Sequence, residues 1–585
     1  MAGGEARRIT RGLVLALVAS AFTFAAPAVA SASYHVGTGI EPINPCPDGT
    51  FPTSGLQGAD VSSCAAGGPV YLGGFGLAGG PVGAAPAQQP APIPGRKATG
   101  VLQATSILQS SGSTVPIPAG EADGAHVRAM AISDGNRGHT LLIADMEVQG
   151  YFAELKQAGV GIMDMRKQVA KDLGLNPQQV WIQSDHTHGG ADPLGVWGGV
   201  PNSFLQYMTQ QTENALENAY RNTRPAQLYY GSVDGKDLLT NQFSSDPENT
   251  SQDSGLRVLQ ARDPRTGQTF ATLLDFSAHA DVLGSSNTKL TGDWPSATNV
   301  ELEQRFGGFA MTVVGTLGRT QPQRGPAYSA CSAQSGDALS YCAIYQYGKQ
   351  VTDRAAQAVA GATRITGRPL VAAHSYLLED TATNAPILGL EYAGFAVGAP
   401  LYRAIGPPWL TGTEIGSVTG TARIGDVMLS SIPGEAYPQI ALKVSSTVTG
   451  IRPGGFMTAG LSNDQLGYLI APFSAYPQPV ERSMFSQALS SDVIQGCVAS
   501  PNTNTCPQPS PISNDNYFFN VSHTMGERVT CSLLRGSDDV MHPGQTTFHD
   551  SFSDCNLFAN DAVLSPGTDV TASDALPKLP DTSNP

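Results

Sequence analysis

The sequence predicts a mixed α/β fold in which central β-sheets are flanked by helices. Two apolar runs of strand length, HVRAMAIS (126–133) and HTLLIADMEV (139–148), indicate strands of a sheet that is covered on both faces. The segment 153–173 has apolar residues at helical spacing and stops near Gly174. A further apolar run, ending VWIQ, follows it. This strand–helix–strand order is typical of an α/β sheet.

Residues 1–32 have the pattern of an export signal. Arg7, Arg8 and Arg11 precede or begin an apolar run from Gly12 to Phe24, and small residues follow as a cleavage site. No later run approaches the ~20 apolar residues of a membrane span. We therefore expect a secreted protein with no transmembrane span after processing.

The charge balance limits the classes of partner. The formal net charge is −15 and the sequence pI is about 5.1, which argues against nucleic acid or an anionic membrane as a main partner. The oligomeric state is left open.

All eight cysteines follow the export signal, and an even number in an oxidising compartment indicates disulfides. Eight cysteines allow about 105 pairings, so the sequence does not establish connectivity. No CxxC pattern occurs, which argues against a cysteine-type zinc site. Pairing of sequence neighbours would give Cys46–Cys64, Cys331–Cys342, Cys497–Cys506 and Cys531–Cys555.

The stretch Ser184–His188 is the first candidate functional site. His186 and His188 lie two residues apart where a predicted strand ends, so their side chains would point the same way into a pocket. Histidine is the commonest metal ligand and a frequent general acid or base near neutral pH. A solvated polar turn with two incidental histidines explains the local pattern equally well, because HxH is short.

The rest of the chain supplies further strands that end at polar residues. A strand at 272–277 leads to His279, and a strand at 427–432 leads to Glu435. In the Gly- and Pro-rich segment 65–100, residues 80–98 are interpreted as a flexible surface loop. The part 69–76 is left open, because its glycines could bring Tyr71 and Phe75 close to a ligand. Further elements are expected as helices at 201–222 and from about Pro295, and as strands near 34–40, 226–233, 255–261 and 309–315.

Several of these segments resemble, in order, motifs of the neutral ceramidases, zinc amidases that cleave the amide of N-acyl-sphingosine. The matches span roughly residues 34–535. Each motif alone is a modest match, but their occurrence in the same order is specific to this family. The resemblance implies one neutral-ceramidase-like zinc amidohydrolase domain at 33–540. A C-terminal tail at 541–585 would then replace the β-sandwich domain of that family. The matching segments are YHVGTGI (34–40), HVRAMAI (126–132), HTH (186–188), DFSAHAD (275–281), LTGDW (290–294), SSIPGEAY (430–437) and GLSNDQLGYLIAP (460–472).

The resemblance also implies a cofactor and a set of roles. Zn²⁺ would be held by His186, His279, Glu435 and Tyr468, and His188 would be the catalytic imidazole. Imidazole and carboxylate are ordinary zinc ligands, whereas only the resemblance suggests tyrosine. Asp185 and Asp293 would orient a ligand or contact the substrate, although Asp185 could equally cap its turn.

The sequence departs from the family in the substrate machinery. The family motif GDxSPN, which carries the catalytic Ser, aligns with a segment that has Arg319 for Asp and Gln321 for Ser. Gln465 stands where the family has Tyr. We therefore expect zinc-activated water to attack, His188 to move the proton, and Gln321 to donate to the developing oxyanion.

Three functional hypotheses follow. The leading one is an exported zinc hydrolase that cleaves the amide of ceramide or a related N-acyl lipid, with transient contact at a membrane surface left open. A zinc hydrolase of another acyl ester or amide is the second. The third is a secreted binding protein that has the same fold but no activity.

Overall fold

A computed structural model describes residues 33–52, 67–75, 96–102, 124–241 (without 156 and 158), 252–382, 403–404, 413–470, 520–521 and 525–542. These residues belong to a unit that comprises residues 33–585. The predicted export signal, the segment 497–506 and nearly all of the predicted tail lie outside the described residues.

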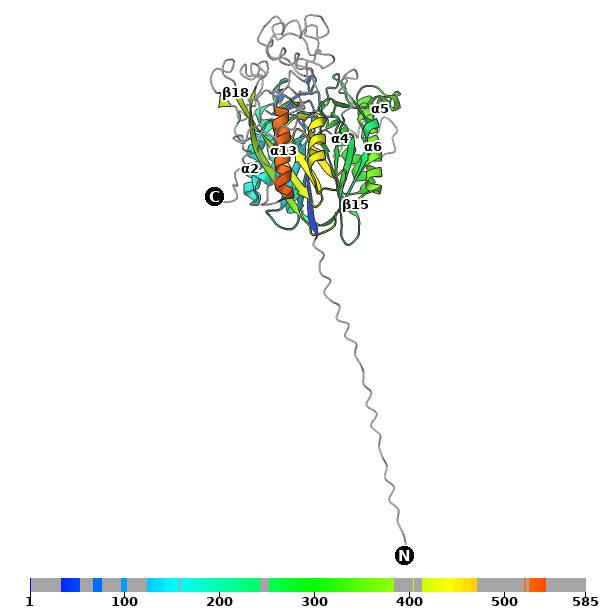
Figure 1. Cartoon of the computed structure of the whole chain (residues 1–585). Coiled ribbons are helices and arrows are strands. Elements are labelled where there is room, and N and C mark those ends of the chain that lie inside the picture. Colours follow the sequence, from blue (N-terminus) through cyan, green and yellow to red (C-terminus); the bar gives the residue numbers. More distant parts are fainter. Residues whose placement is uncertain are drawn as a thin grey trace. The chain divides into compact units, whose positions relative to one another are not determined.

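A nine-stranded sheet forms the centre of the fold (Figure 1). Its strand order is β13-β12-β11-β9-β1-β6-β7-β8, and β15 also pairs with β9. The pairs β7–β8 and β12–β13 are parallel, and the other neighbours are antiparallel. The strands are β1 (Tyr34–Pro42), β6 (His126–Ser133), β7 (Thr140–Met146), β8 (Val180–Ser184), β9 (Arg224–Asp234), β11 (Gly255–Arg262), β12 (Thr269–Phe276), β13 (Phe309–Val314) and β15 (Thr363–Arg364).

A second, five-stranded sheet packs against the first. Its order is β16-β18-β19-β21, with β17 paired to β18, and β19–β21 is its parallel pair. Apolar side chains of both sheets form one buried cluster, in which Trp181 of β8 lies against Gly420 of β18. A side chain at position 420 would collide with this indole ring, so the close approach requires glycine. The strands are β16 (Val371–Ala382), β17 (Arg403–Ala404), β18 (Thr413–Ile424), β19 (Val427–Ser431) and β21 (Phe456–Ala459).

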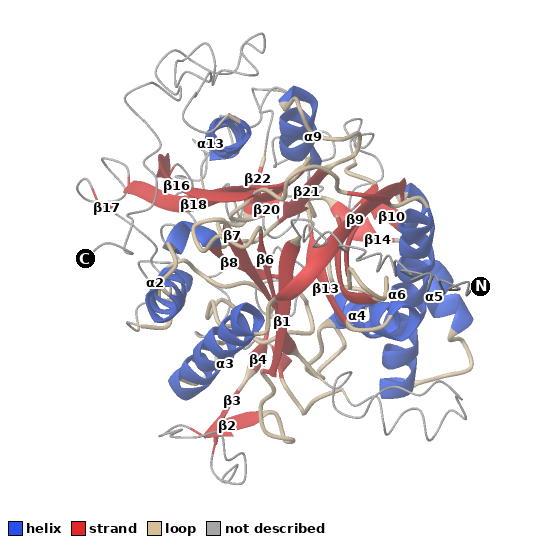
Figure 2. Ribbon diagram, turned by 90° about the horizontal axis from the view of Figure 1, so that it is seen from below, coloured by secondary structure: helices blue, strands red, loops and turns tan. Residues whose placement is uncertain are grey.

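Helices cover the outer face of each sheet, which gives four layers (Figure 2). Helices α2 and α3 pack on one half of the larger sheet, α4 and α6 pack on its other half, and α9 and α13 cover the smaller sheet. None of the described helices is long and apolar enough to cross a membrane. The α-helices are α2 (Ile162–Leu173), α3 (Asn202–Arg221), α4 (Asp293–Phe306), α5 (Gly325–Ala330), α6 (Gly336–Ala360), α9 (Pro438–Thr447) and α13 (Met525–Met541), and the 3₁₀ turns are η3 (Pro177–Gln179) and η4 (Lys236–Leu238).

Four short two-stranded ladders complete the described structure. They are β2 (Thr50–Pro52) with β3 (Gly67–Pro69), β4 (Tyr71–Leu72) with β5 (Arg96–Lys97), β10 (Leu239–Asn241) with β14 (Thr320–Pro322), and β20 (Glu435–Ala436) with β22 (Tyr468–Leu469). The last three position candidate site residues.

The predicted mixed α/β class is confirmed, and so is the burial of the central strands on both faces. Every residue of β6 is buried. Along this strand Ala129 faces the cluster under the helices and Met130 faces the second sheet. One prediction needs correction, because the helix expected from residue 153 begins only at Ile162. The preceding segment is a loop fixed by tertiary hydrogen bonds, including one from the backbone N–H of Ala153 to Asp464 Oδ1.

The disulfide Cys331–Cys342 is confirmed and joins the end of α5 to α6. Cys46 and Cys531 are also disulfide-bonded, but their partners lie outside the described residues.

Replacing both Cys331 and Cys342 with Ala should destabilise the protein. The bridge closes a loop with a sequence separation of 11, and closing a loop of about this size contributes about 3 kcal/mol through the unfolded state. Denaturant unfolding at equilibrium measures this difference. An unchanged unfolding midpoint would show that the bridge contributes no stability.

Candidate metal centre

The candidate site lies where parallel strands of both sheets end at their carboxyl termini. His186 and His188 follow β8, and His279 follows β12. Glu435 follows β19, and Tyr468 lies beyond β21, its parallel neighbour. The predicted placement of the histidine pair at the end of a strand is therefore confirmed.

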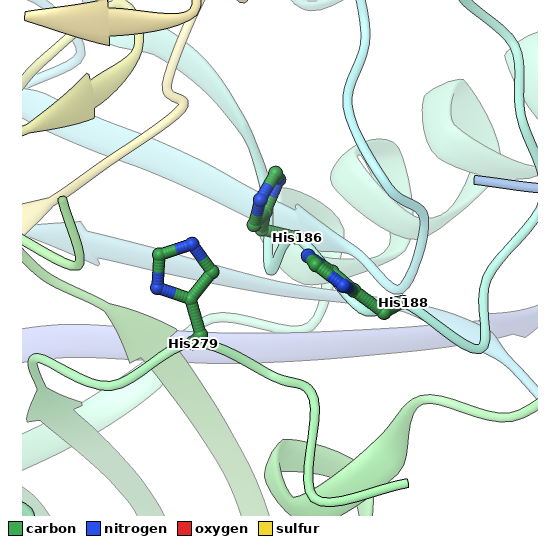
Figure 3. Close-up of side chains that lie close together, drawn as sticks. All are labelled: His186, His188 and His279. Atoms are coloured by element: carbon green, nitrogen blue, oxygen red, sulfur yellow. The ribbon is translucent and has the colours of Figure 1, made fainter. Parts of the chain in front are cut away.

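The three imidazole rings converge on one point (Figure 3). Each offers a ring nitrogen within 4.8 Å of the other two, and all three residues are buried. The His186 ring centroid lies 4.9 Å from that of His188 and 5.1 Å from that of His279. In the described part of the chain, this is the one group of three or more such side chains spaced to hold a metal ion.

Backbone carbonyl groups fix the orientation of two of these rings. His186 Nδ1 lies 2.7 Å from the carbonyl oxygen of Gln149, and His279 Nδ1 lies 2.9 Å from that of Thr320. Because a carbonyl oxygen only accepts, each Nδ1 must carry the proton and donate it. In the neutral tautomer both Nε2 atoms then present a lone pair, as is usual for histidine ligands of metals.

The two Nε2 atoms face the same carboxylate oxygen. Glu435 Oε2 lies 3.4 Å from His186 Nε2 and 3.3 Å from His279 Nε2. Three atoms with lone pairs repel one another at this range unless protons or a cation lie between them. Ligand atoms bonded to zinc at about 2.0–2.1 Å in a tetrahedron lie about 3.3 Å apart, so these side chains fit a zinc ion.

The electrostatics of the site favour an ionised Glu435. Burial alone would raise the pKa of Glu435, but His186 and His279, when they carry a proton on Nε2, outweigh burial and lower this pKa below its ordinary value. Burial likewise opposes the charged form of His279, yet Glu435 raises the pKa of this ring overall. The carboxylate is thus available as an anionic ligand.

Two residues of the 460–470 segment adjoin Glu435. Tyr468 is the register partner of Glu435 in the β20–β22 ladder, and its ring centroid lies 6.5 Å from that of His279. Gln465 donates from Nε2 to Glu435 Oε1 at 3.4 Å, while its own Oε1 is buried without a partner in the described structure. Gln465 therefore orients the carboxylate.

His188 differs from the other two rings because neither of its ring nitrogens has a hydrogen-bond partner among the described residues. Burial and the two neighbouring imidazoles lower the pKa of His188 well below its ordinary value. The ring is therefore neutral at physiological pH and can accept a proton.

The loop 73–75, which follows β4, covers His188 and resolves the open interpretation of this segment. The Phe75 ring meets the His188 ring edge-on, with centroids 4.6 Å apart. Gly74 has φ +93°, and a Cβ at this position would collide with the imidazole. Tyr71 instead packs over Gly198. Of the two aromatic residues, Phe75 is the one at the site.

The two candidate aspartates hold loops and make no hydrogen bond to an imidazole among the described residues. Asp185 Oδ1 accepts from the backbone N–H of Thr187, so Asp185 caps the turn that carries the histidines. Asp293 accepts from the backbone N–H groups of Val282 and Leu283, which follow His279. Burial raises the pKa of Asp293 to about 7.

Gln321 lies on β14 directly after Thr320, whose carbonyl group orients His279. With its amide nitrogen turned toward Asp281, it donates to the two carboxylate oxygens at 2.6 and 2.9 Å. The nitrogen expected to contact a substrate oxyanion is thus engaged by a neighbouring side chain.

The described non-glycine residues with positive φ all border the site, which indicates stored backbone strain. Each such residue costs roughly 1–3 kcal/mol, so their clustering here points to a functional constraint. They are His186 (φ 59°), Asp293 (φ 52°), Arg319 (φ 72°), Leu461 (φ 45°) and Asn463 (φ 70°).

Comparisons with known proteins identify the fold of the chain through solved structures and find no related sequence. No protein-family model matches the sequence, and no curated protein matches it. A neutral ceramidase structure from Pseudomonas aeruginosa superposes with a TM-score of 0.51 and 14% identity, covering 83% of this chain and 77% of that one. A second solved ceramidase structure, a complex, matches with the same score and identity over 83% of this chain and 79% of its own. The chain therefore has the neutral ceramidase fold, as the ordered sequence motifs predicted.

Proposed function

We propose that this protein is a zinc-dependent amidohydrolase that cleaves the amide bond of ceramide or a related N-acyl lipid. The observation that carries the proposal is the buried convergence of His186 Nε2, His279 Nε2 and Glu435 Oε2 at 3.3–3.4 Å, beside an unpartnered His188. The fold that the chain shares with solved ceramidases supports the same class of reaction.

The ligand set that we propose is His186, His279, Glu435 and Tyr468. His188 is close enough to be a ligand as well. Its ring, however, lacks the carbonyl acceptor that orients the other two, which supports a role in proton transfer. A bound zinc ion would polarise the acyl oxygen and lower the pKa of a water molecule.

His188 takes the proton from the attacking water and delivers it to the leaving nitrogen. A neutral, buried imidazole suits this role, because it accepts a proton in one step and donates it in the next. Phe75 and Gly74 exclude bulk water from one side of the ring.

The hydroxyl groups near the position of the family's serine do not have the contacts of a nucleophile. Thr320 Oγ1 is buried without a partner in the described structure, and Thr316 Oγ1 contacts Ser277 Oγ at 3.4 Å. An activated hydroxyl needs a base within hydrogen-bond reach. We therefore propose water as the nucleophile, and an oxyanion role for Gln321 requires its amide to leave Asp281.

We also propose that the chain is exported and that residues 1–32 are removed. The disulfide between Cys331 and Cys342 is consistent with an oxidising compartment. N-terminal sequencing of the secreted protein should find a start between about Ala30 and Ser33. An intact Met1 on a protein retained in the cytoplasm would contradict export.

The zinc proposal predicts that His279→Ala lowers metal content far more than it lowers stability. The purified parent should contain about one zinc per chain by elemental analysis, and the variant only a small fraction of this. His139→Ala is the matched control, because this exposed histidine lies in the turn between β6 and β7 and pairs with Asp134. Full zinc retention in His279→Ala would show that His279 is not a zinc ligand.

The mechanism predicts that His188→Ala lowers kcat/KM for N-acyl amide hydrolysis by about 100-fold or more, because general acid–base catalysis contributes this much. Thr320→Ala should leave turnover close to that of the parent, since it removes an unpartnered hydroxyl group. A covalent acyl-enzyme trapped on Thr320, together with an inactive but zinc-loaded Thr320→Ala variant, would refute attack by water.

A further inference from the structure

Arg96 on β5 joins three loops at the rim of the site. It donates from Nη1 to the carbonyl oxygen of Asn287 at 2.6 Å. From Nη2 it donates to the carbonyl oxygens of Gly73 at 2.7 Å and His188 at 2.6 Å. Its guanidinium carbon lies 4.7 Å above the centre of the Phe75 ring, and this ring also contacts His188. The positive charge therefore sits beside the catalytic imidazole that we propose.

The charge of Arg96 has no compensating carboxylate among the described residues. All three of its acceptors are neutral carbonyl groups. A guanidinium has five N–H donors, of which these contacts use three. Burial lowers the pKa of Arg96 to about 10, so the side chain remains charged at neutral pH. Two donors and a full charge are thus left at the rim.

Two other arginines of the fold differ from Arg96 either in their partners or in their access to a ligand. Arg257 is paired with Asp253 and Asp275, as expected for a buried guanidinium. Arg166 also has only neutral partners, but it is fully buried between η3 and β16, where no ligand can reach it. Arg96 remains partly exposed and lies at the site.

We propose that Arg96 binds a carboxylate on the amine side of the substrate, so that the site takes an N-acyl amino acid. This inference rests on the proposed hydrolase function and narrows its substrate class. A carboxylate that accepts from the remaining Nε or Nη1 proton would form a charge-assisted hydrogen bond and supply the missing negative charge. The acyl side of an N-acyl lipid is an apolar chain, so an anion next to the scissile amide belongs to the amine part.

The reaction is an ordinary hydrolysis. Water adds its oxygen to the acyl carbon, the C–N bond breaks, and the proton passes through His188 to the leaving nitrogen. The products are a fatty acid and a free amino acid, and no oxidant or further reactant is required.

Two substrates that share a dodecanoyl chain provide the test: N-dodecanoylglycine, which carries a carboxylate, and N-dodecanoylethanolamine, which carries a hydroxyl group. The parent should prefer the glycine conjugate by about 10-fold or more in kcat/KM, because hydrogen bonds to charged groups are strong. Arg96→Gln should reduce kcat/KM for the glycine conjugate by about 10- to 100-fold and for the ethanolamide by less than about 3-fold. Lys97→Gln is the control, because Lys97 is a neighbouring exposed cation that lies over Tyr71, and it should leave the ratio unchanged.

A purely structural role for Arg96 gives a different result. If Arg96 only joins the loops, Arg96→Gln lowers hydrolysis of both substrates equally and the ratio stays at the parental value, which would overturn the inference. Arg96→Lys keeps the positive charge but has fewer N–H donors, so it should retain part of the preference. A parent that hydrolyses both substrates equally well would also overturn it.

Binding of the two compounds, measured by calorimetry, tests the anion site independently of the proposed hydrolase activity. If zinc-loaded parent hydrolyses neither compound but binds N-dodecanoylglycine more tightly than the ethanolamide, and Arg96→Gln removes the difference, the hydrolase proposal fails and the anion site stands. If neither compound shows Arg96-dependent binding or turnover, the anion site is refuted.

Discussion

The structure depends on one electrostatic constraint, the close approach of two imidazole nitrogens and one carboxylate oxygen out of contact with bulk water. His186 and His279 donate their Nδ1 protons to backbone carbonyl groups, so both Nε2 lone pairs face Glu435. The two Nε2 atoms lie 3.3–3.4 Å from Glu435 Oε2. Without a proton or a cation between them, the two imidazole lone pairs and the carboxylate oxygen repel one another, and this repulsion grows as the local dielectric falls. A bound cation turns the same geometry into a stable one.

The four-layer fold is suited to assembling such a site. The parallel pairs β7–β8, β12–β13 and β19–β21 bring loops from both sheets to their carboxyl ends. Asn463 links the sheets there, since its Oδ1 accepts from the backbone N–H of Ile182 and its Nδ2 donates to Ser431 Oγ. Asn463 adopts positive φ, and so does His186. The strain of these turns is sustained by the buried sheets behind them.

Much of this arrangement could be predicted from residue patterns. The apolar run 126–133 gave a strand with the expected bounds, because its burial on both faces leaves a continuous apolar signal. The approach of His186, His188, His279 and Glu435 followed from the ordered motifs. The start of α2 was missed, because the apolar residues before Ile162 pack in a loop that sequence periodicity does not distinguish from a helix.

Other contacts at the site could not be predicted from the sequence. The acceptors for His186 and His279 are the backbone carbonyls of Gln149 and Thr320, which any residue type can supply. Arg96 stands in a Gly- and Pro-rich segment that was interpreted as a loop, and its contacts span up to 191 residues of sequence. The pairing of Gln321 with Asp281 likewise depends on tertiary placement.

The most direct test of the account is anomalous diffraction from crystals of the purified protein, measured on both sides of the zinc absorption edge. The account predicts one zinc peak per chain, about 2.0–2.1 Å from His186 Nε2, His279 Nε2 and Glu435 Oε2. Zinc-supplemented crystals with no anomalous peak at this point, and with the three side chains still in contact, would contradict it.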